Sequence, residues 1–180
     1  MKQIFVVGPS GVGRTTLCKK LSDLERTIVH VSFDEELKLL IDAGFPMPQK
    51  RSGEEGREFW RFCQGVIHNL TERLHTDITL LFDVDAGAEY IPECQEYLIE
   101  RAESLICLTG SPDDVYAREV KRAAEIGNPP RPQEEFMDTE FSPAIQKLFD
   151  AAVVKINITH EDTETALEEF RAAVMELAAK

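Results

Sequence analysis

The chain has 180 residues and an apolar fraction of 43%, which suits one globular domain with a full core and argues against wholesale disorder. Its formal net charge of −13 argues against a general nucleic-acid binder and against binding to an anionic membrane. The four cysteines form no C-x-x-C pair, which argues against a zinc site or disulfide framework and favours a reducing, cytoplasmic location.

Strand and helix patterns alternate along the chain. Apolar or β-branched segments predict five strands, at 3–8, 27–32, 78–82, 104–108 and 153–158. The first apolar run is too short for a signal peptide or a membrane span. Helical patterns lie at about 14–25, 35–43, 54–75, 92–102, 111–126, 142–151 and 162–179. The alternation predicts an α/β fold, a parallel sheet covered on both faces, within a single domain over 1–180.

The turn after the first strand has the spacing of a phosphate-binding loop. Residues 8–15 are Gly-Pro-Ser-Gly-Val-Gly-Arg-Thr, which matches G-x-x-x-x-G-K-[ST] except that Arg14 replaces the lysine. Glycines let the backbone N–H groups point inward, at the positive end of the following helix. We therefore expect nucleotide phosphates to bind Gly8, Gly11, Val12, Gly13, Arg14, Thr15 and Thr16. The alternative is a glycine-rich turn that binds nothing.

Two side chains of this loop have chemistry suited to phosphoryl transfer. A hydroxyl at Thr15 can ligate the magnesium ion that bridges nucleotide phosphates. Arg14 keeps the positive charge of the usual lysine and can pair with the β- and γ-phosphate oxygens, so it is a candidate catalytic residue.

Acidic residues follow the second and third predicted strands. Ligands collect at the carboxyl ends of parallel strands, so Asp34, Asp83 and Asp85 are expected at one edge of the sheet. Asp83 fits a magnesium role together with Thr15, unless it only ends the strand. Asp34 can accept a proton from a substrate hydroxyl or help to hold magnesium, and its alternative role is a helix N-cap.

Arginines are the third group of candidates. Arg118 and Arg122 lie one helical turn apart, and Arg131 lies in a proline-rich segment. We expect a lid over about 118–140 that closes these arginines over the nucleotide, with 127–140 disordered in the absence of ligand. The arginines can instead pair with acids on the helix surface. Arg61 points either into an acceptor pocket or to solvent.

The order of these motifs resembles that of the shikimate kinase family. The residues that carry the resemblance are the loop at 8–16, Asp34, Gly-Arg-Glu-Phe-Trp-Arg at 56–61, Arg118, and Arg131 with Pro132. It implies a P-loop kinase fold with a five-stranded sheet in the order 2-3-1-4-5. It also implies that Arg61 binds the acceptor, and that Asp85 and Gly87 stand where the family's triple glycine contacts substrate.

The resemblance implies an ATP-dependent kinase that transfers the γ-phosphoryl group to a hydroxyl of a small metabolite. Catalysis would use Arg14, Asp34 and Arg131, with ATP and Mg²⁺ as cofactors and a monomer or small homo-oligomer as the assembly. The chain has no guanine-reading N-K-x-D motif, which favours ATP over GTP. Two alternatives stay open: a nucleoside or nucleotide kinase, and a nucleotide-binding protein without catalysis.

Overall fold

The computed structural model describes residues 1–42, 44, 53–74, 77–84, 91–158 and 163–180. Five strands form one parallel sheet in the order β2-β3-β1-β4-β5. The strands are β1 (Lys2–Val7), β2 (Ile28–Ser32), β3 (Thr79–Asp83), β4 (Leu105–Thr109) and β5 (Val154–Asn157). The predicted fold class and strand order are therefore confirmed.

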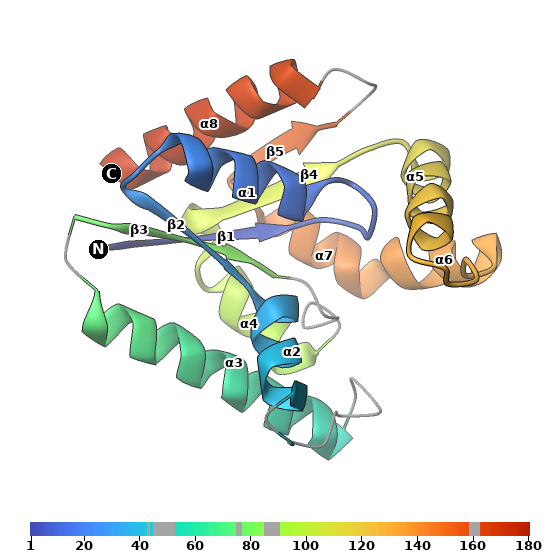
Figure 1. Cartoon of the computed structure of the whole chain (residues 1–180), viewed down its shortest axis with the longest axis horizontal. Coiled ribbons are helices and arrows are strands. Elements are labelled where there is room, and N and C mark those ends of the chain that lie inside the picture. Colours follow the sequence, from blue (N-terminus) through green and yellow to red (C-terminus); the bar gives the residue numbers. More distant parts are fainter. Residues whose placement is uncertain (43, 45–52, 75–76, 85–90, 159–162) are drawn as a thin grey trace.

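Helices cover both faces of the sheet, as Figure 1 shows. One face packs on α1 (Arg14–Leu24) and α8 (Thr163–Ala179), and the other on α3 (Gly53–Arg73), α4 (Pro92–Ile99) and α7 (Pro143–Ala151). Side chains along β1 alternate between the two cores, with Phe5 in one and Ile4 in the other. This alternation explains the continuous apolar runs in the sequence, because a strand covered on both faces has no polar side.

Three further helices lie toward the carboxyl edge of the sheet. Helix α2 (Phe33–Asp42) follows β2 directly, and α5 (Pro112–Glu125) follows β4. The Ser111 hydroxyl caps α5 by accepting a hydrogen bond from the backbone N–H of Asp114, as its sequence pattern indicates. Helix α6 (Gln133–Glu140) comes next and lies beside α5 in Figure 1.

Helix α6 departs from the sequence prediction. The segment 127–140 was expected to be disordered without ligand, yet the structure describes it throughout and its second half is helical. The ring of Phe136 is fully buried and contacts the ring of Tyr116 at a centroid distance of 5.3 Å. This burial stabilises a helix of eight residues that is too short to show a clear hydrophobic period.

Register places the ends of the central strands together. Asp83, the last residue of β3, pairs with Val6 of β1 and with Ser32 of β2. The loop after β1, the start of α2 and the Asp83 carboxylate therefore share one edge of the sheet. Within the described residues, no helix combines the length and the apolar character needed to cross a membrane.

Candidate functional site

The loop at residues 8–15 approaches its neighbours so closely that glycine is required at two positions. A Cβ atom at Gly8 would lie 2.4 Å from the carbonyl oxygen of Leu108 in β4. A Cβ atom at Gly11 would lie 2.9 Å from the carbonyl oxygen of Val115 in α5, at a backbone φ of +84°. Two of the glycines in the motif therefore let the loop nest between β4 and α5.

The N-terminus of α1 is open toward this loop. Its N-cap residue is Gly13, which offers no side-chain acceptor, and the first turn of the helix carries no acidic residue. The first backbone N–H groups of a helix have no partner within the helix and sit at its positive end. This geometry suits the binding of a phosphate group. Thr16 lies exposed in this turn, and the buried side chain of Val12 anchors the loop.

Thr15 and Asp83 meet directly below the loop. The Thr15 hydroxyl donates a hydrogen bond of 2.6 Å to Asp83 Oδ2, and Asp83 is fully buried. Its second oxygen, Oδ1, is buried and has no hydrogen-bond partner among the described residues. A hydroxyl and a carboxylate are both hard oxygen ligands of the kind that magnesium prefers. The two residues therefore fit a magnesium site, as the sequence predicts.

The charge of Asp83 is supported by its surroundings. Burial is the largest single influence and raises the pKa of this carboxyl. The neighbouring His30 imidazole, the Arg14 guanidinium and the Thr15 hydroxyl together lower the pKa by more than burial raises it, so the pKa lies below its ordinary value. Asp83 therefore stays ionised at neutral pH, the state that a magnesium ligand needs.

Arg14 points toward the end of β3. Its Nη1 donates a hydrogen bond of 2.5 Å to the carbonyl oxygen of Val84, and its Nε lies 3.7 Å from Asp83 Oδ1. The residue is 9% exposed. The guanidinium therefore lies beside the Asp83 carboxylate, whereas the sequence motif predicts that it extends toward the β- and γ-phosphates.

His30 is a site residue that the sequence reading missed, because its spacing to other histidines forms no metal motif. Its Nε2 is buried, has no hydrogen-bond partner within the part of the chain that the structure describes, and lies 3.7 Å from Asp83 Oδ2. The signal was available in the strand order, because β2 lies next to β3 and the register pairs Ser32 with Asp83. A residue two positions earlier on β2 lies on the same face of the sheet.

Arg122 contacts the loop through an acidic partner. It donates to both carboxylate oxygens of Glu119, at 2.9 and 3.0 Å, and Glu119 is only 6% exposed. The Ser10 hydroxyl of the loop donates to Glu119 at 3.1 Å and accepts from Arg122 at 3.3 Å. Arg122 therefore contacts the loop at Ser10 and pairs with an acid of its own helix, the alternative that the sequence also offered.

Arg131 is held at the other side of Ser10. Its Nη2 lies 2.6 Å from Glu140 Oε1, and its guanidinium carbon lies 5.0 Å from the centroid of the Phe136 ring. The second oxygen of Glu140 accepts a hydrogen bond of 2.9 Å from the backbone N–H of Ser10. Arg131 is thus connected to the loop at residues 8–15 through the Glu140 carboxylate.

Arg118 and Asp34 are two further residues that the sequence predicts for the site. Arg118 donates to the carbonyl oxygens of Asp114, at 3.3 Å, and Ile158, at 3.1 Å, which places it at the carboxyl end of β5. Asp34 is exposed in the first turn of α2, and the Ser32 hydroxyl accepts the hydrogen bond from the backbone N–H of Glu35 at the start of this helix. Ser32 therefore fills the capping role considered for Asp34.

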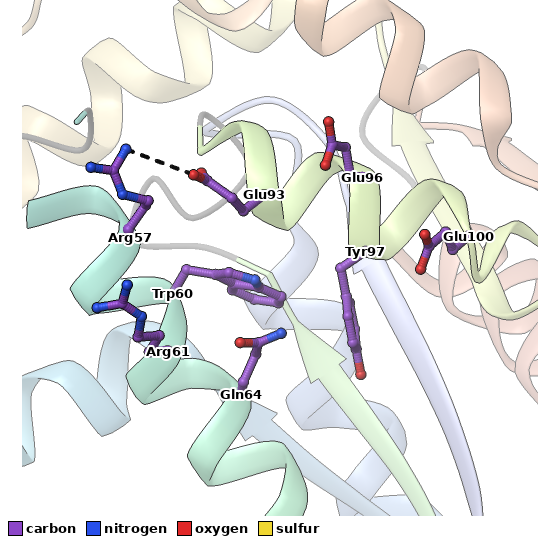
Figure 2. Close-up of a pocket in the computed structure, with 8 residues that line it drawn as sticks. All are labelled: Arg57, Trp60, Arg61, Gln64, Glu93, Glu96, Tyr97 and Glu100. Atoms are coloured by element: carbon purple, nitrogen blue, oxygen red, sulfur yellow. Dashed lines mark ion pairs between the residues drawn. The ribbon is translucent and has the colours of Figure 1, made fainter. Parts of the chain in front are cut away.

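Arg61 lines a groove between α3 and α4, with a cavity of about 380 Å³. Figure 2 shows the residues that line it, which are Arg57, Trp60, Arg61 and Gln64 on α3 and Glu93, Glu96, Tyr97 and Glu100 on α4. The side chains of Arg57 and Glu93 lie 4.0 Å apart, and Arg61 is exposed. The two remaining acceptor candidates, Asp85 and Gly87, lie outside the described residues.

Comparison with solved structures shows the same fold over almost the whole chain. Shikimate kinase from Bacteroides thetaiotaomicron matches with a TM-score of 0.63 and 19% identity, over 99% of both chains. A gluconokinase from Sinorhizobium meliloti 1021 matches with a TM-score of 0.55 and 14% identity, over 99% of this chain and 94% of the other. A tunicamycin resistance protein from Deinococcus radiodurans matches with a TM-score of 0.64 and 16% identity, over 96% and 95%.

These likenesses define the class of fold, that of the shikimate-kinase-like P-loop kinases, as the sequence resemblance implies. At identities between 14% and 20% they establish the fold alone. No protein-family model matches the chain, and no curated protein matches it in sequence.

Proposed function

We propose that this protein is an ATP-dependent kinase that transfers the γ-phosphoryl group of ATP to a hydroxyl of a small molecule. The observation that carries the proposal is the Thr15–Asp83 pair, joined by a hydrogen bond of 2.6 Å beneath an open helix N-terminus. This combination provides N–H donors for phosphate and oxygen ligands for magnesium in one place. The solved structures of similar fold that are named as kinases support the same class of reaction.

The residues around the loop would divide the work of phosphoryl transfer. Thr15 and Asp83 would hold Mg²⁺, which would offset the negative charge that develops on the phosphate during transfer. Arg122 and Arg131 lie on either side of Ser10, close enough to the loop to neutralise phosphate charge. We place Arg118 near the nucleotide as well, at the carboxyl end of β5.

The acceptor would bind at the α2 and α3 side of the sheet edge. Asp34 lies exposed at the end of β2, where a carboxylate can orient the acceptor hydroxyl and accept its proton. Arg61, Asp85 and Gly87 are the other residues that we assign to the acceptor. The similar structures are named for shikimate, gluconate and tunicamycin, so this fold accepts varied hydroxyl compounds, and we propose no single acceptor.

A second function is favoured by one observation, the orientation of Arg14. Its guanidinium donates a hydrogen bond to the Val84 carbonyl oxygen and lies beside the Asp83 carboxylate. In this arrangement the positive charge of Arg14 is therefore paired at the end of β3. A chain that kept this arrangement with nucleotide bound would hold ATP without the usual charge at the transferring phosphate. The alternative is therefore a nucleotide-binding protein without phosphoryl transfer.

Calorimetric titration of magnesium–ATP into the purified protein tests the proposal first. We expect a micromolar dissociation constant, and a loss of at least about tenfold in Thr15→Val because the variant removes a magnesium ligand. Lys20→Ala is the matched control, because it removes an exposed side chain from the same helix. If the unmodified protein does not bind magnesium–ATP, the proposed function is wrong.

Arg14→Lys then separates the kinase from the binding protein. Phosphate transfer from radiolabelled ATP is measured against a panel of hydroxyl metabolites that includes nucleosides. Turnover by the unmodified chain that falls in Arg14→Lys would show that arginine is adapted to this site. Turnover that appears only in Arg14→Lys would favour the binding protein.

A further inference from the structure

Glu140 is a buried carboxylate at the mouth of the phosphate-binding loop. It ends α6 and is only 2% exposed. Its Oε2 accepts the hydrogen bond of 2.9 Å from the backbone N–H of Ser10, and its Oε1 lies 2.6 Å from Nη2 of Arg131. Both oxygens are therefore satisfied by groups of the nucleotide site.

These two partners are the kind of donors that a phosphate oxygen uses. Backbone N–H groups of a glycine-rich loop and an arginine fork bind carboxylate and phosphate oxygens with the same geometry. The chain thus supplies an anion of its own where the proposed function needs an anion from the nucleotide. The backbone of Arg131 is also held in place, because the Tyr116 hydroxyl donates a hydrogen bond of 2.9 Å to the Arg131 carbonyl oxygen.

A second acid reinforces the arrangement from α5. Glu119 accepts from the Ser10 hydroxyl at 3.1 Å and pairs with Arg122. Ser10 therefore lies between two buried carboxylates, each of which also holds one of the arginines assigned to phosphate. Removing a carboxylate changes the charge that a bound triphosphate meets, because like charges at short range repel in a poorly solvated site.

We propose that Glu140 is an internal competitor of the nucleotide. Its carboxylate occupies the place of a phosphate oxygen at Ser10, and a bound triphosphate displaces it and takes over Arg131. The inference rests on the proposed ATP binding and adds to it a contact that competes with the nucleotide. The lid arginine is held on Glu140 until a phosphate arrives, so closure of the lid is coupled to occupation of the loop.

An internal competitor predicts the direction in which the affinity for magnesium–ATP changes when its charge is removed. Glu140→Gln keeps the shape of the side chain and an acceptor for the Ser10 N–H, but it removes the charge that holds Arg131 and repels phosphate. We expect the variant to bind magnesium–ATP and inorganic tripolyphosphate about tenfold more tightly than the unmodified chain, a change of about 1.4 kcal/mol. A residue that positioned Arg131 for the phosphate would give the opposite result, because its loss would weaken binding.

The experiment is calorimetric titration of both probes into the full chain and its variants. Glu134→Gln is the matched control, since it makes the same chemical change at an exposed position of the same helix. Circular dichroism checks that each variant is folded. Should Glu140→Gln not fold, Glu140→Asp decides, because it keeps the charge and shortens the reach by one methylene group, and we expect about threefold tighter binding from it.

Each outcome has one meaning. Tighter binding in the Glu140 variants, with Glu134→Gln unchanged, supports the internal competitor. Equal or weaker binding overturns it while leaving the proposed function intact, provided that the unmodified chain binds ATP. Binding by the Glu140 variants alone would show that Glu140 closes the site, which supports the competitor and overturns the proposed function for the unmodified chain. Binding by no form of the chain overturns both the inference and the proposed function.

Discussion

Ion pairs are buried to different extents in two regions, the sheet edge around the loop at residues 8–15 (the phosphate-binding edge) and the α3–α4 groove. At the edge, Arg131 and Glu140 lie 2.6 Å apart and the Glu140 side chain is 3% exposed. In the groove, Arg57 and Glu93 lie 4.0 Å apart and their side chains are 48% and 42% exposed. Removing one partner of a pair that contains a buried carboxylate is costly, whereas an exposed pair contributes little. The contrast is therefore between a charge pair with a buried carboxylate at the edge and a charge pair with two exposed partners in the groove.

Exposed side chains on α3 and α4 can therefore change at little expense in stability. Three substitutions test how far the contrast holds, in order of decreasing expected effect.

The largest effect is expected from Asp83→Asn. The Asp83 carboxyl is fully buried beside Arg14, so neutralising it leaves the guanidinium without its charged partner, and we expect a loss of about 3 kcal/mol in the free energy of unfolding at pH 7. Because folding lowers the pKa of Asp83 below its ordinary value of 3.8, the stabilisation is present above that pH and is lost as the pH falls through the folded pKa.

Urea unfolding of both proteins between pH 7 and pH 3 measures the effect. The gap between them should be constant from pH 7 to about 5 and should narrow below 3.8. Asp23→Asn is the control, since Asp23 is exposed on α1. A gap that widened toward low pH would contradict the assigned direction of the pKa shift.

Gly8→Ala should have a smaller but clear effect. The added Cβ atom would lie 2.4 Å from the Leu108 carbonyl oxygen, so the loop must move, and we expect a loss of about 2 kcal/mol in stability together with weaker ATP binding. Gly65→Ala is the comparison in α3, where a Cβ atom meets nothing within 4 Å. Alanine is the better helix former, so this variant should be as stable as the original or up to about 1 kcal/mol more stable. Similar losses from both would mean that the phosphate edge is no tighter than the groove.

The smallest effect is expected in the groove itself. Glu93→Gln removes the carboxylate opposite Arg57, and because the pair is exposed we expect a change of less than about 0.5 kcal/mol in the free energy of unfolding. Thermal unfolding with and without about 0.5 M salt, which screens exposed ion pairs, measures this change in the free energy of unfolding. A salt-sensitive loss above about 1 kcal/mol would show that the groove is as ordered as the phosphate edge.

The sequence was sufficient for the fold because its signals are periodic and local. The P-loop spacing, the strand runs and the Ser111 cap all appear in the structure at or near their predicted positions. Helix α6 was not predicted because prolines precede it. Its stability comes from burial of Phe136 against α5, a tertiary contact that no local sequence pattern indicates.

The buried acids were harder to recognise. Glu119 lies four residues after Val115 and four before Ala123, both buried, so an acid stood on the core-facing stripe of α5. That position alone could have marked Glu119 as a site residue. No sequence pattern singles out Glu140, because its contact with Ser10 joins residues that are 130 positions apart in the chain. The orientation of Arg14 toward Val84 is likewise a tertiary fact.

The single tryptophan of the chain lies in the groove rather than at the P-loop. Trp60 is 3% exposed and packs edge-on against Tyr97, with ring centroids 5.1 Å apart. Its emission therefore reports on the α3–α4 side of the molecule. Fluorescence can thus follow the proposed acceptor side during a titration while calorimetry follows the binding of magnesium–ATP, in one unlabelled protein.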